Sequence, residues 1–164
     1  MYKIRQGEKG DFPLIRELAL QVWPQTYASL LSPAQITYML ELMYSETALA
    51  KQIQDGAEFI ILENKDIPSG FASFGETEKD VYKLHKIYVL ITEQGKGSGR
   101  FLIQHILDTI RARGAASLQL QVNRQNRARE FYEKLGFSII REVDLDIGNG
   151  YFMRDFIMEK KITS

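Results

Sequence analysis

Residues 94–100 read Gln94-Gly95-Lys96-Gly97-Ser98-Gly99-Arg100, with three glycines alternating over five positions. This seven-residue segment lies between a strand-like run, Val81–Val89, and a helix-like run, Phe101–Arg113. Glycine accepts positive φ and lets a ligand approach bare amides. The first N–H groups of a helix have no partner inside the helix and carry the positive end of its dipole. This glycine-rich segment therefore predicts a strand–loop–helix unit whose loop binds an anion, most often a phosphate.

The spacing of these glycines excludes two common phosphate-binding loops. A loop that binds a nucleoside triphosphate requires GxxxxGK followed by Ser or Thr, and residues 94–100 lack that pattern. A dinucleotide-binding GxGxxG would place its third glycine at position 100, which is Arg100. The remaining alternative is a flexible turn that only caps the helix.

Length and composition bound the class of protein. The 164 residues predict a single domain over 1–164, and 45% hydrophobic with 26% charged residues is ordinary for a soluble globular protein. Twenty-one Lys and Arg balance 21 Asp and Glu, which argues against a nucleic-acid partner. The N-terminus lacks a signal-peptide pattern and no run is long enough to span a membrane, so no membrane partner and a cytoplasmic location are expected. Without cysteine, and with two histidines, no metal site is expected.

Hydrophobic periodicity and turn residues predict a mixed α/β (α+β) layout around one sheet. A first strand at 2–5 is followed by three helices that begin at Asp11, Ser32 and Ser45, the first of them ending at Trp23-Pro24. The remaining elements are strands at 59–62, 70–75 and 81–89, a helix at 101–113, a strand at 117–122, a helix at 126–135, and a final hairpin of strands at 137–143 and 151–159.

Two blocks of sequence resemble the signature of one family. The first is Leu84-His85-Lys86-Ile87-Tyr88-Val89, four further residues, and then Gln94-x-x-Gly97-x-Gly99. The second comprises residues 120–123, Asn126, Ala128 and the run Phe131-Tyr132-Glu133-Lys134-Leu135-Gly136-Phe137. Together, in this order and spacing, they are similar to the GNAT superfamily of acyl-CoA-dependent N-acetyltransferases over residues 81–140.

The resemblance implies a GNAT-like fold: a central, mixed, mostly antiparallel twisted sheet of about seven strands, flanked by helices and splayed between the strands 81–89 and 117–122. It implies acetyl-CoA as cosubstrate. Loop amides would bind the pyrophosphate, the end of the strand would offer backbone groups to the pantetheine arm, and Asn126 would hydrogen-bond that arm, although Asn126 also suits a helix N-cap. The implied acetyl-CoA-binding residues are Ile87, Tyr88, Val89, Gln94, Gly95, Lys96, Gly97, Ser98, Gly99, Arg100, Asn126 and Tyr132.

The resemblance also implies catalytic roles. Tyr132 matches the family's usual general acid, which protonates the departing thiolate; its alternative is a core tyrosine. The family often places a Glu base at the position of Lys83, and a lysine is a poor base unless it is desolvated. His85, two residues on, is the second expected catalytic residue, with Glu76 and water as alternatives. His105 is expected to be a surface or structural residue.

The acceptor pocket is expected from the N-terminal helices and the last hairpin. The helices are rich in large side chains that also suit a core, namely Trp23, Tyr27, Tyr38, Met39, Met43 and Tyr44. Four carboxylates are candidates for recognising a cationic amine, namely Glu41, Asp144, Asp146 and Asp155. The closing strand is weakly similar to that of polyamine-type members of the family. The terminal hairpin could pair with the same hairpin of a second copy, so a homodimer is an open alternative.

The predicted function is transfer of the acetyl group of acetyl-CoA to a primary amine of a small molecule or peptide, by direct attack in a ternary complex. No covalent enzyme intermediate is expected, because the chain lacks cysteine and a GxSxG elbow. The alternative is a catalytically inactive acyl-CoA-binding or regulatory module, which Lys83 motivates. A nucleic-acid-binding domain around Arg124, Arg127 and Arg129 is the weakest hypothesis, because those cations also suit CoA phosphates.

Overall fold

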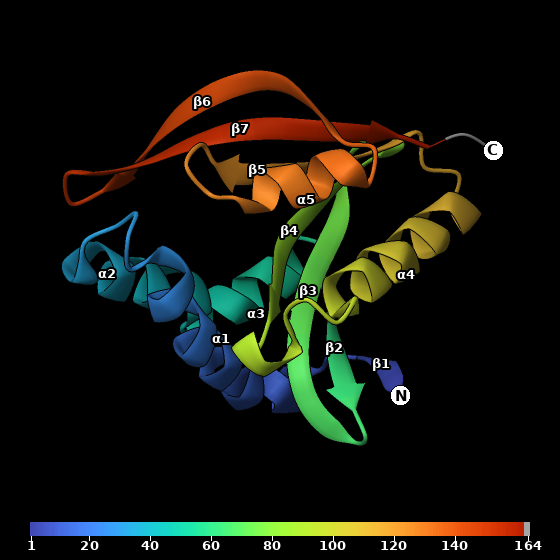
Figure 1. Cartoon of the computed structure of the whole chain (residues 1–164), viewed down its shortest axis with the longest axis horizontal. Coiled ribbons are helices and arrows are strands. Elements are labelled where there is room, and N and C mark those ends of the chain that lie inside the picture. The colour runs from blue at the N-terminus through green and yellow to red at the C-terminus, as the bar shows by residue number, and fades with distance from the viewer. Residues whose placement is uncertain (163–164) are drawn as a thin grey trace. The chain divides into compact units, whose positions relative to one another are not determined.

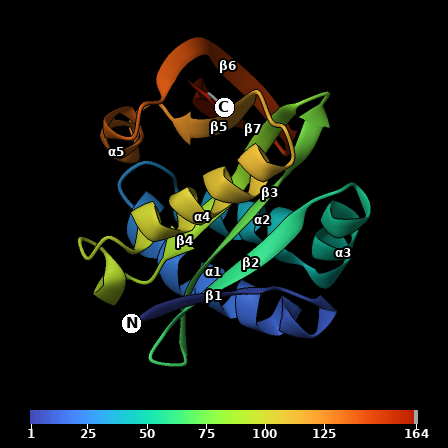
Figure 2. The same cartoon turned by 90° about the vertical axis from the view of Figure 1, so that its right-hand side faces the viewer.

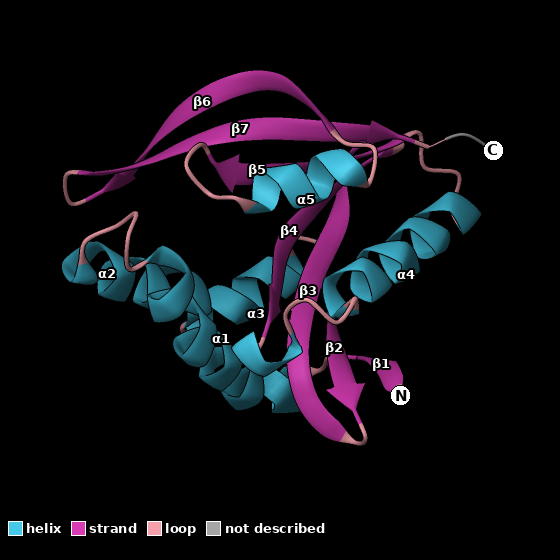
Figure 3. Ribbon diagram, in the orientation of Figure 1, coloured by secondary structure: helices cyan, strands magenta, loops and turns pink. Residues whose placement is uncertain are grey.

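A computed structural model describes residues 1–162 and contains five α-helices and seven strands in that range (Figures 1 and 3). Hydrogen bonding joins the strands in the order β1-β2-β3-β4-β5-β7-β6. The β4–β5 pair is parallel, whereas β1–β2, β2–β3, β5–β7 and β6–β7 are antiparallel. The expected α/β fold with a mixed, mostly antiparallel sheet is confirmed. In chain order the elements are β1 (Tyr2–Gln6), α1 (Phe12–Tyr27), α2 (Pro33–Tyr44), α3 (Glu46–Gln54), β2 (Glu58–Asn64), β3 (Ile67–Glu78), β4 (Val81–Val89), α4 (Ser98–Ala112), β5 (Ser117–Asn123), α5 (Ala128–Lys134), β6 (Ser138–Gly148) and β7 (Tyr151–Lys161).

The chain divides into two compact units. The first unit comprises Met1–Gly75 and His85–Ile106, and the second comprises Glu76–Leu84 and the chain from Leu107 onward. In the first unit α1, α2 and α3 pack on one another (Figure 1). The helix starts are those that the sequence predicts: the hydroxyls of Ser32 and Ser45 each accept a hydrogen bond at 3.1 Å from the backbone N–H three residues on.

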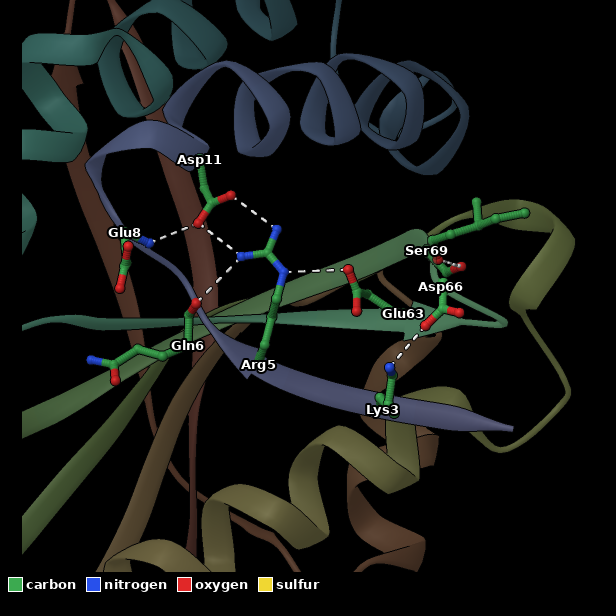
Figure 4. A network of polar contacts seen from close by, with 9 residues as sticks. Lys3, Arg5, Gln6, Glu8, Asp11, Glu63, Asp66 and Ser69 are labelled. Atoms are coloured by element: carbon green, nitrogen blue, oxygen red, sulfur yellow. Dashed lines mark hydrogen bonds and ion pairs between the residues drawn. The ribbon is translucent and has the colours of Figure 1, made fainter.

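An ion-pair network fixes the start of the first unit (Figure 4). The Arg5 guanidinium donates to both carboxylate oxygens of Asp11, at 2.9 and 3.0 Å, and to Glu63 at 3.3 Å. Asp11 also accepts from the backbone N–H of Glu8 at 2.9 Å. The predicted cap residue therefore stands at the start of α1, but its carboxylate ties that helix to β1 and β2. The Arg5 cation lowers the pKa of Asp11.

In the second unit β5, β6 and β7 form an antiparallel ladder, and α5 packs against one face of it (Figures 1 and 2). The Arg129 guanidinium lies 5.6 Å from the centre of the Phe156 ring, and the Lys160 ammonium donates to the Leu135 carbonyl at 2.9 Å. Phe156 stands opposite Val122, and Lys160 stands opposite Leu118, in the β5–β7 register. The face that α5 covers is therefore the face of the buried Leu118, Leu120 and Val122.

Several predicted boundaries are wrong, and two of them have a clear physical cause. The first helix continues past Trp23-Pro24 to Tyr27, although Pro24 has no N–H to donate within the helix. The buried Trp23 ring packs 4.7 Å from the ring of Tyr27, and this contact stabilises the last turn. Strand β3 is also longer than the predicted run 70–75, because the positive φ of Lys65 and Asp66 makes a tight turn that pairs Ile67 with Asn64. Over residues 1–162, no helix is both long and apolar enough to cross a membrane.

Candidate active site

The glycine loop of the first unit has the backbone geometry that its sequence predicts. Gly95 has φ of +79° and Gly97 has φ of +83°, which are left-handed values that favour glycine. Residues 94–97 are exposed, α4 begins at Ser98, and the Phe101 N–H makes an early helical bond to the Gly97 carbonyl at 3.0 Å. The loop therefore presents a helix N-terminus to solvent, which is suited to an anion.

A buried acid anchors this loop, and no sequence motif predicts it. Glu93 is 7% exposed and accepts from the Tyr2 hydroxyl at 2.9 Å and from the Asn64 amide at 3.0 Å. The backbone carbonyl of Glu93 accepts from the Ser98 hydroxyl at 3.0 Å. The hydrogen bonds from Asn64 and Tyr2 lower the pKa of Glu93. The entrance of the loop is thus tied to β1 and β2, while residues 94–97 stay exposed.

At the end of β4 the backbone lies very close to the backbone of β3. Ile87, Tyr88 and Val89 are half-buried there. A Cβ on Gly70 of β3 would lie 2.7 Å from the Tyr88 carbonyl oxygen, so only glycine fits without a shift. The Tyr88 hydroxyl lies 3.0 Å from that of Tyr27, and its ring packs 5.8 Å from the ring of Trp23. Both the backbone and the side chain of Tyr88 are therefore fixed.

The aromatic residues of α1 and α2 pack mainly in the core. Trp23, Met39 and Tyr44 are 3%, 3% and 1% exposed, whereas Tyr38 and Met43 are half-buried. Burial raises the pKa of Tyr44 above its usual range. A hollow of about 290 Å³ lies between α1 and α2, and an ion pair of 2.9 Å between Arg16 and Glu41 lines it. The Glu41 carboxylate is therefore already paired with a cation.

The second unit carries Asn126 and Tyr132. The Asn126 side-chain oxygen accepts from the Ala128 N–H at 2.9 Å, which makes an Asx turn that leads into α5. This helix begins at Ala128, two residues later than predicted. Tyr132 is 8% exposed, and its ring lies 5.9 Å from that of Phe137. Tyr132 lies on the helix that covers the Val122 face of the β5–β7 pair.

Lys83, the two histidines and Glu76 have different surroundings. Lys83 is half-buried, its ammonium donates to the Gln121 side-chain oxygen at 2.6 Å, and burial lowers its pKa. His85 is exposed on β4, and His105 is exposed on α4. The exposed Glu76 accepts from the Asp80 N–H at 3.1 Å, which gives its carboxylate a role in the turn before β4.

The three carboxylates of the hairpin also differ. Asp144 is exposed and pairs with Arg124, and the exposed Asp146 accepts from the Gly148 N–H at 2.9 Å. Asp155 is 3% exposed, and the amide of Gln121 donates to it at 3.5 Å. Burial raises the pKa of Asp155 to about 6, against the opposing charges of Arg124 and Lys83. Sequence alone did not rank these carboxylates, and burial singles out Asp155.

Residues 27–149 match the family model described as the acetyltransferase (GNAT) domain, and the chain belongs to this family. The ribosomal protein bS18-alanine N-acetyltransferase of Haemophilus influenzae is 35% identical over 92 residues, which are 56% of this chain and 58% of that protein. The uncharacterized N-acetyltransferase YuaI of Bacillus subtilis is 27% identical over 90% of this chain and 86% of its own. The crystal structure of the PaiA N-acetyltransferase from Thermoplasma acidophilum in complex with coenzyme A superposes with a TM-score of 0.83 and 25% identity, covering 98% of this chain and 99% of that one. Membership makes the chain an acyltransferase of the acetyl-CoA-dependent N-acetyltransferase class.

Proposed function

We propose that this protein transfers the acetyl group of acetyl-CoA to a primary amine by direct attack in a ternary complex. The observation that carries the proposal is the exposed loop with positive φ at Gly95 and Gly97, which opens directly onto α4 in a chain of the GNAT family. The relative that is named for acetylating an alanine of ribosomal protein bS18 supports an amine as the acceptor. A cytoplasmic enzyme accords with a chain that lacks cysteine.

In the proposed mechanism the amides of residues 94–100 bind the pyrophosphate of acetyl-CoA. Backbone groups of Ile87, Tyr88 and Val89 bind the pantetheine arm, and Asn126 bonds the same arm. The amine attacks the thioester carbonyl to give a tetrahedral species, which backbone amides at the end of β4 stabilise. The C–S bond then breaks, and the Tyr132 hydroxyl gives its proton to the thiolate.

The direct test is to measure release of free CoA thiol from acetyl-CoA with a panel of primary amines and short peptides. Calorimetric titration with acetyl-CoA measures the first half of the reaction separately. Saturable binding together with amine-dependent CoA release is expected. A chain that does not bind acetyl-CoA would rule the proposal out.

Tyr132→Phe removes only the phenolic oxygen. If Tyr132 protonates the leaving thiolate, kcat falls by roughly 100-fold with little change in the dissociation constant of acetyl-CoA. Tyr151→Phe, which removes a hydroxyl from a half-buried residue of β7, is the matched control and is expected to keep kcat. An unchanged kcat in Tyr132→Phe would remove this residue from the mechanism.

An inactive acyl-CoA-binding module is the second candidate function. The observation that favours it is Lys83, a half-buried cation at the position where the family often has a glutamate. This candidate predicts tight binding of acetyl-CoA without CoA release on any amine. Turnover with one amine would exclude it.

A further inference from the structure

The second unit has one polar sheet face, which crosses β4, β5 and β7. Lys83 stands beside Gln119 in the parallel β4–β5 register, and Gln119 stands opposite Glu159 in the antiparallel β5–β7 register. Because side chains alternate between the faces of a strand, Gln121 and Asp155 lie on this same face. Since α5 covers the other face, this polar face is the one opposite Tyr132.

Asp155 is connected to Lys83 through Gln121 rather than directly. The Lys83 ammonium donates to the Gln121 oxygen at 2.6 Å, and the Gln121 nitrogen donates to Asp155 Oδ2 at 3.5 Å, the long limit for such a bond. The amide can satisfy both neighbours only in this orientation, with its acceptor toward the cation and its donor toward the anion. These two successive hydrogen bonds, from Lys83 to Gln121 and from Gln121 to Asp155, therefore orient the carboxylate without a direct ion pair that would neutralise it.

The Asp155 carboxylate is buried and poorly satisfied. An ionised carboxylate offers about four acceptor sites. Within residues 1–162, the long bond from Gln121 is the one hydrogen bond to the Asp155 carboxylate. The nearby Arg124 guanidinium instead serves the Val143 carbonyl at 3.1 Å and the carboxylates of Glu142 and Asp144. A buried carboxylate in this condition favours a cationic donor, because leaving it unpaired costs free energy.

We infer that Asp155 is the carboxylate that binds the acceptor's ammonium group and takes a proton from it, with Gln121 and Lys83 as positioning residues. The inference rests on the proposed function and names its acceptor class, a primary amine that binds as a cation. One N–H proton moves from R–NH₃⁺ to Asp155 and then to solvent. The free amine then forms the C–N bond and the C–S bond breaks. The attacking nitrogen loses a second proton in this step, and this loss balances the proton that the thiolate receives from Tyr132.

The titration of Asp155 depends on groups from each element that packs beside it. Lys83 on β4 and Arg124 after β5 favour the ionised form, as does the donor amide of Gln121 on β5. Glu142 and Asp144 on β6 hold the Arg124 cation. Burial opposes ionisation and leaves the pKa of Asp155 at about 6, which suits a base that works at neutral pH.

The test is the pH dependence of kcat/KM for an amine whose own pKa lies above 9. A protein base that deprotonates the bound ammonium gives a plateau from pH 6.5 to 8.5 with a fall below about pH 6. Without such a base only the free amine reacts, and kcat/KM then rises tenfold per pH unit across that range. Wild type is expected to show the plateau. Asp155→Asn is expected to show the continuous rise, with kcat/KM at pH 7 lowered at least about 100-fold and acetyl-CoA binding unchanged.

Three further variants separate catalysis from folding. Asp155→Glu is expected to recover part of the plateau, and Asp55→Asn, an exposed change at the end of α3, is the matched control that keeps wild-type behaviour. Lys83→Met removes a charge that lowers the pKa of Asp155, so the fall at acid pH should move to higher pH. A merely structural Asp155 would not produce that movement.

The outcomes separate this inference from the proposed function. An active wild type whose plateau survives in Asp155→Asn overturns the role of Asp155 and leaves the acetyltransferase proposal standing. Loss of the plateau in His85→Gln, with Asp155 intact, assigns the base to His85 and equally overturns the inference. A wild type that binds no acetyl-CoA refutes the proposed function, and the inference falls with it.

Discussion

Replacing Asp155 by Asn should stabilise the folded protein at neutral pH while it removes activity. Burial raises the pKa of Asp155 to about 6, whereas an unfolded aspartate titrates near 4. A folded-state pKa above the unfolded value means that stability is fully present below about pH 4 and is lost as the pH rises through about 6. The attractions of Arg124 and Lys83 already oppose burial in that pKa, so it states the net cost of ionising the carboxyl group.

The magnitude follows from linkage. A pKa raised by about 2 corresponds to about 3 kcal/mol of unfolding free energy at pH 8, and to about 1.5 kcal/mol at pH 5. Asn has almost the same shape and carries no charge to desolvate. The Asp155→Asn variant should therefore exceed wild type in unfolding free energy by up to these amounts, with the larger excess at pH 8.

The assay is urea denaturation, followed by circular dichroism, at pH 5, 6, 7 and 8. Wild type, Asp155→Asn and Asp146→Asn are compared, the last being an exposed carboxyl on the neighbouring strand. The excess stability of Asp155→Asn should grow with pH, and Asp146→Asn should follow wild type. A variant that is less stable than wild type at pH 8, or an excess that does not change with pH, would refute the reasoning.

Three other changes test the loop, the strand and the network at the N-terminus. Gly97→Ala forces alanine to positive φ and should cost about 1 kcal/mol and raise the KM for acetyl-CoA in steady-state assays, whereas Gly114→Ala, at a φ of +85° away from the loop, should cost the same without the rise. Gly70→Ala brings a methyl group to 2.7 Å from the backbone of β4 and should lower the unfolding free energy by about 1–3 kcal/mol in urea, whereas Gly10→Ala meets nothing within 4 Å and should behave as wild type. Asp11→Asn should cost about 1 kcal/mol in urea at pH 7. The difference should begin to shrink as the pH falls below the unfolded carboxyl pKa and should vanish only below the lower pKa of the folded carboxyl; an equal loss at pH 3 would contradict this.

Local rules predicted the order of the elements and several boundaries. Ser32 and Ser45 start helices because a hydroxyl satisfies a free N–H within the same turn, and the glycines at 95 and 97 take φ values that few other residues adopt. The prediction failed at Pro24, where ring packing of Trp23 on Tyr27 carries the helix through a residue that normally ends one. A contact between side chains overrode a local rule there.

The sequence by itself predicted the strand–loop–helix unit and the family, because these depend on residue spacing over short stretches. Only the tertiary structure decided what holds the loop and which carboxylate is buried. The Tyr2–Glu93 bond joins residues 91 positions apart, and the Lys83–Gln121 bond joins residues 38 positions apart. Asp144, Asp146 and Asp155 are the same residue type, and the sequence alone does not distinguish them. They differ in the structure because the strand register places Asp155 on a buried face, where desolvation raises the pKa of its carboxyl group.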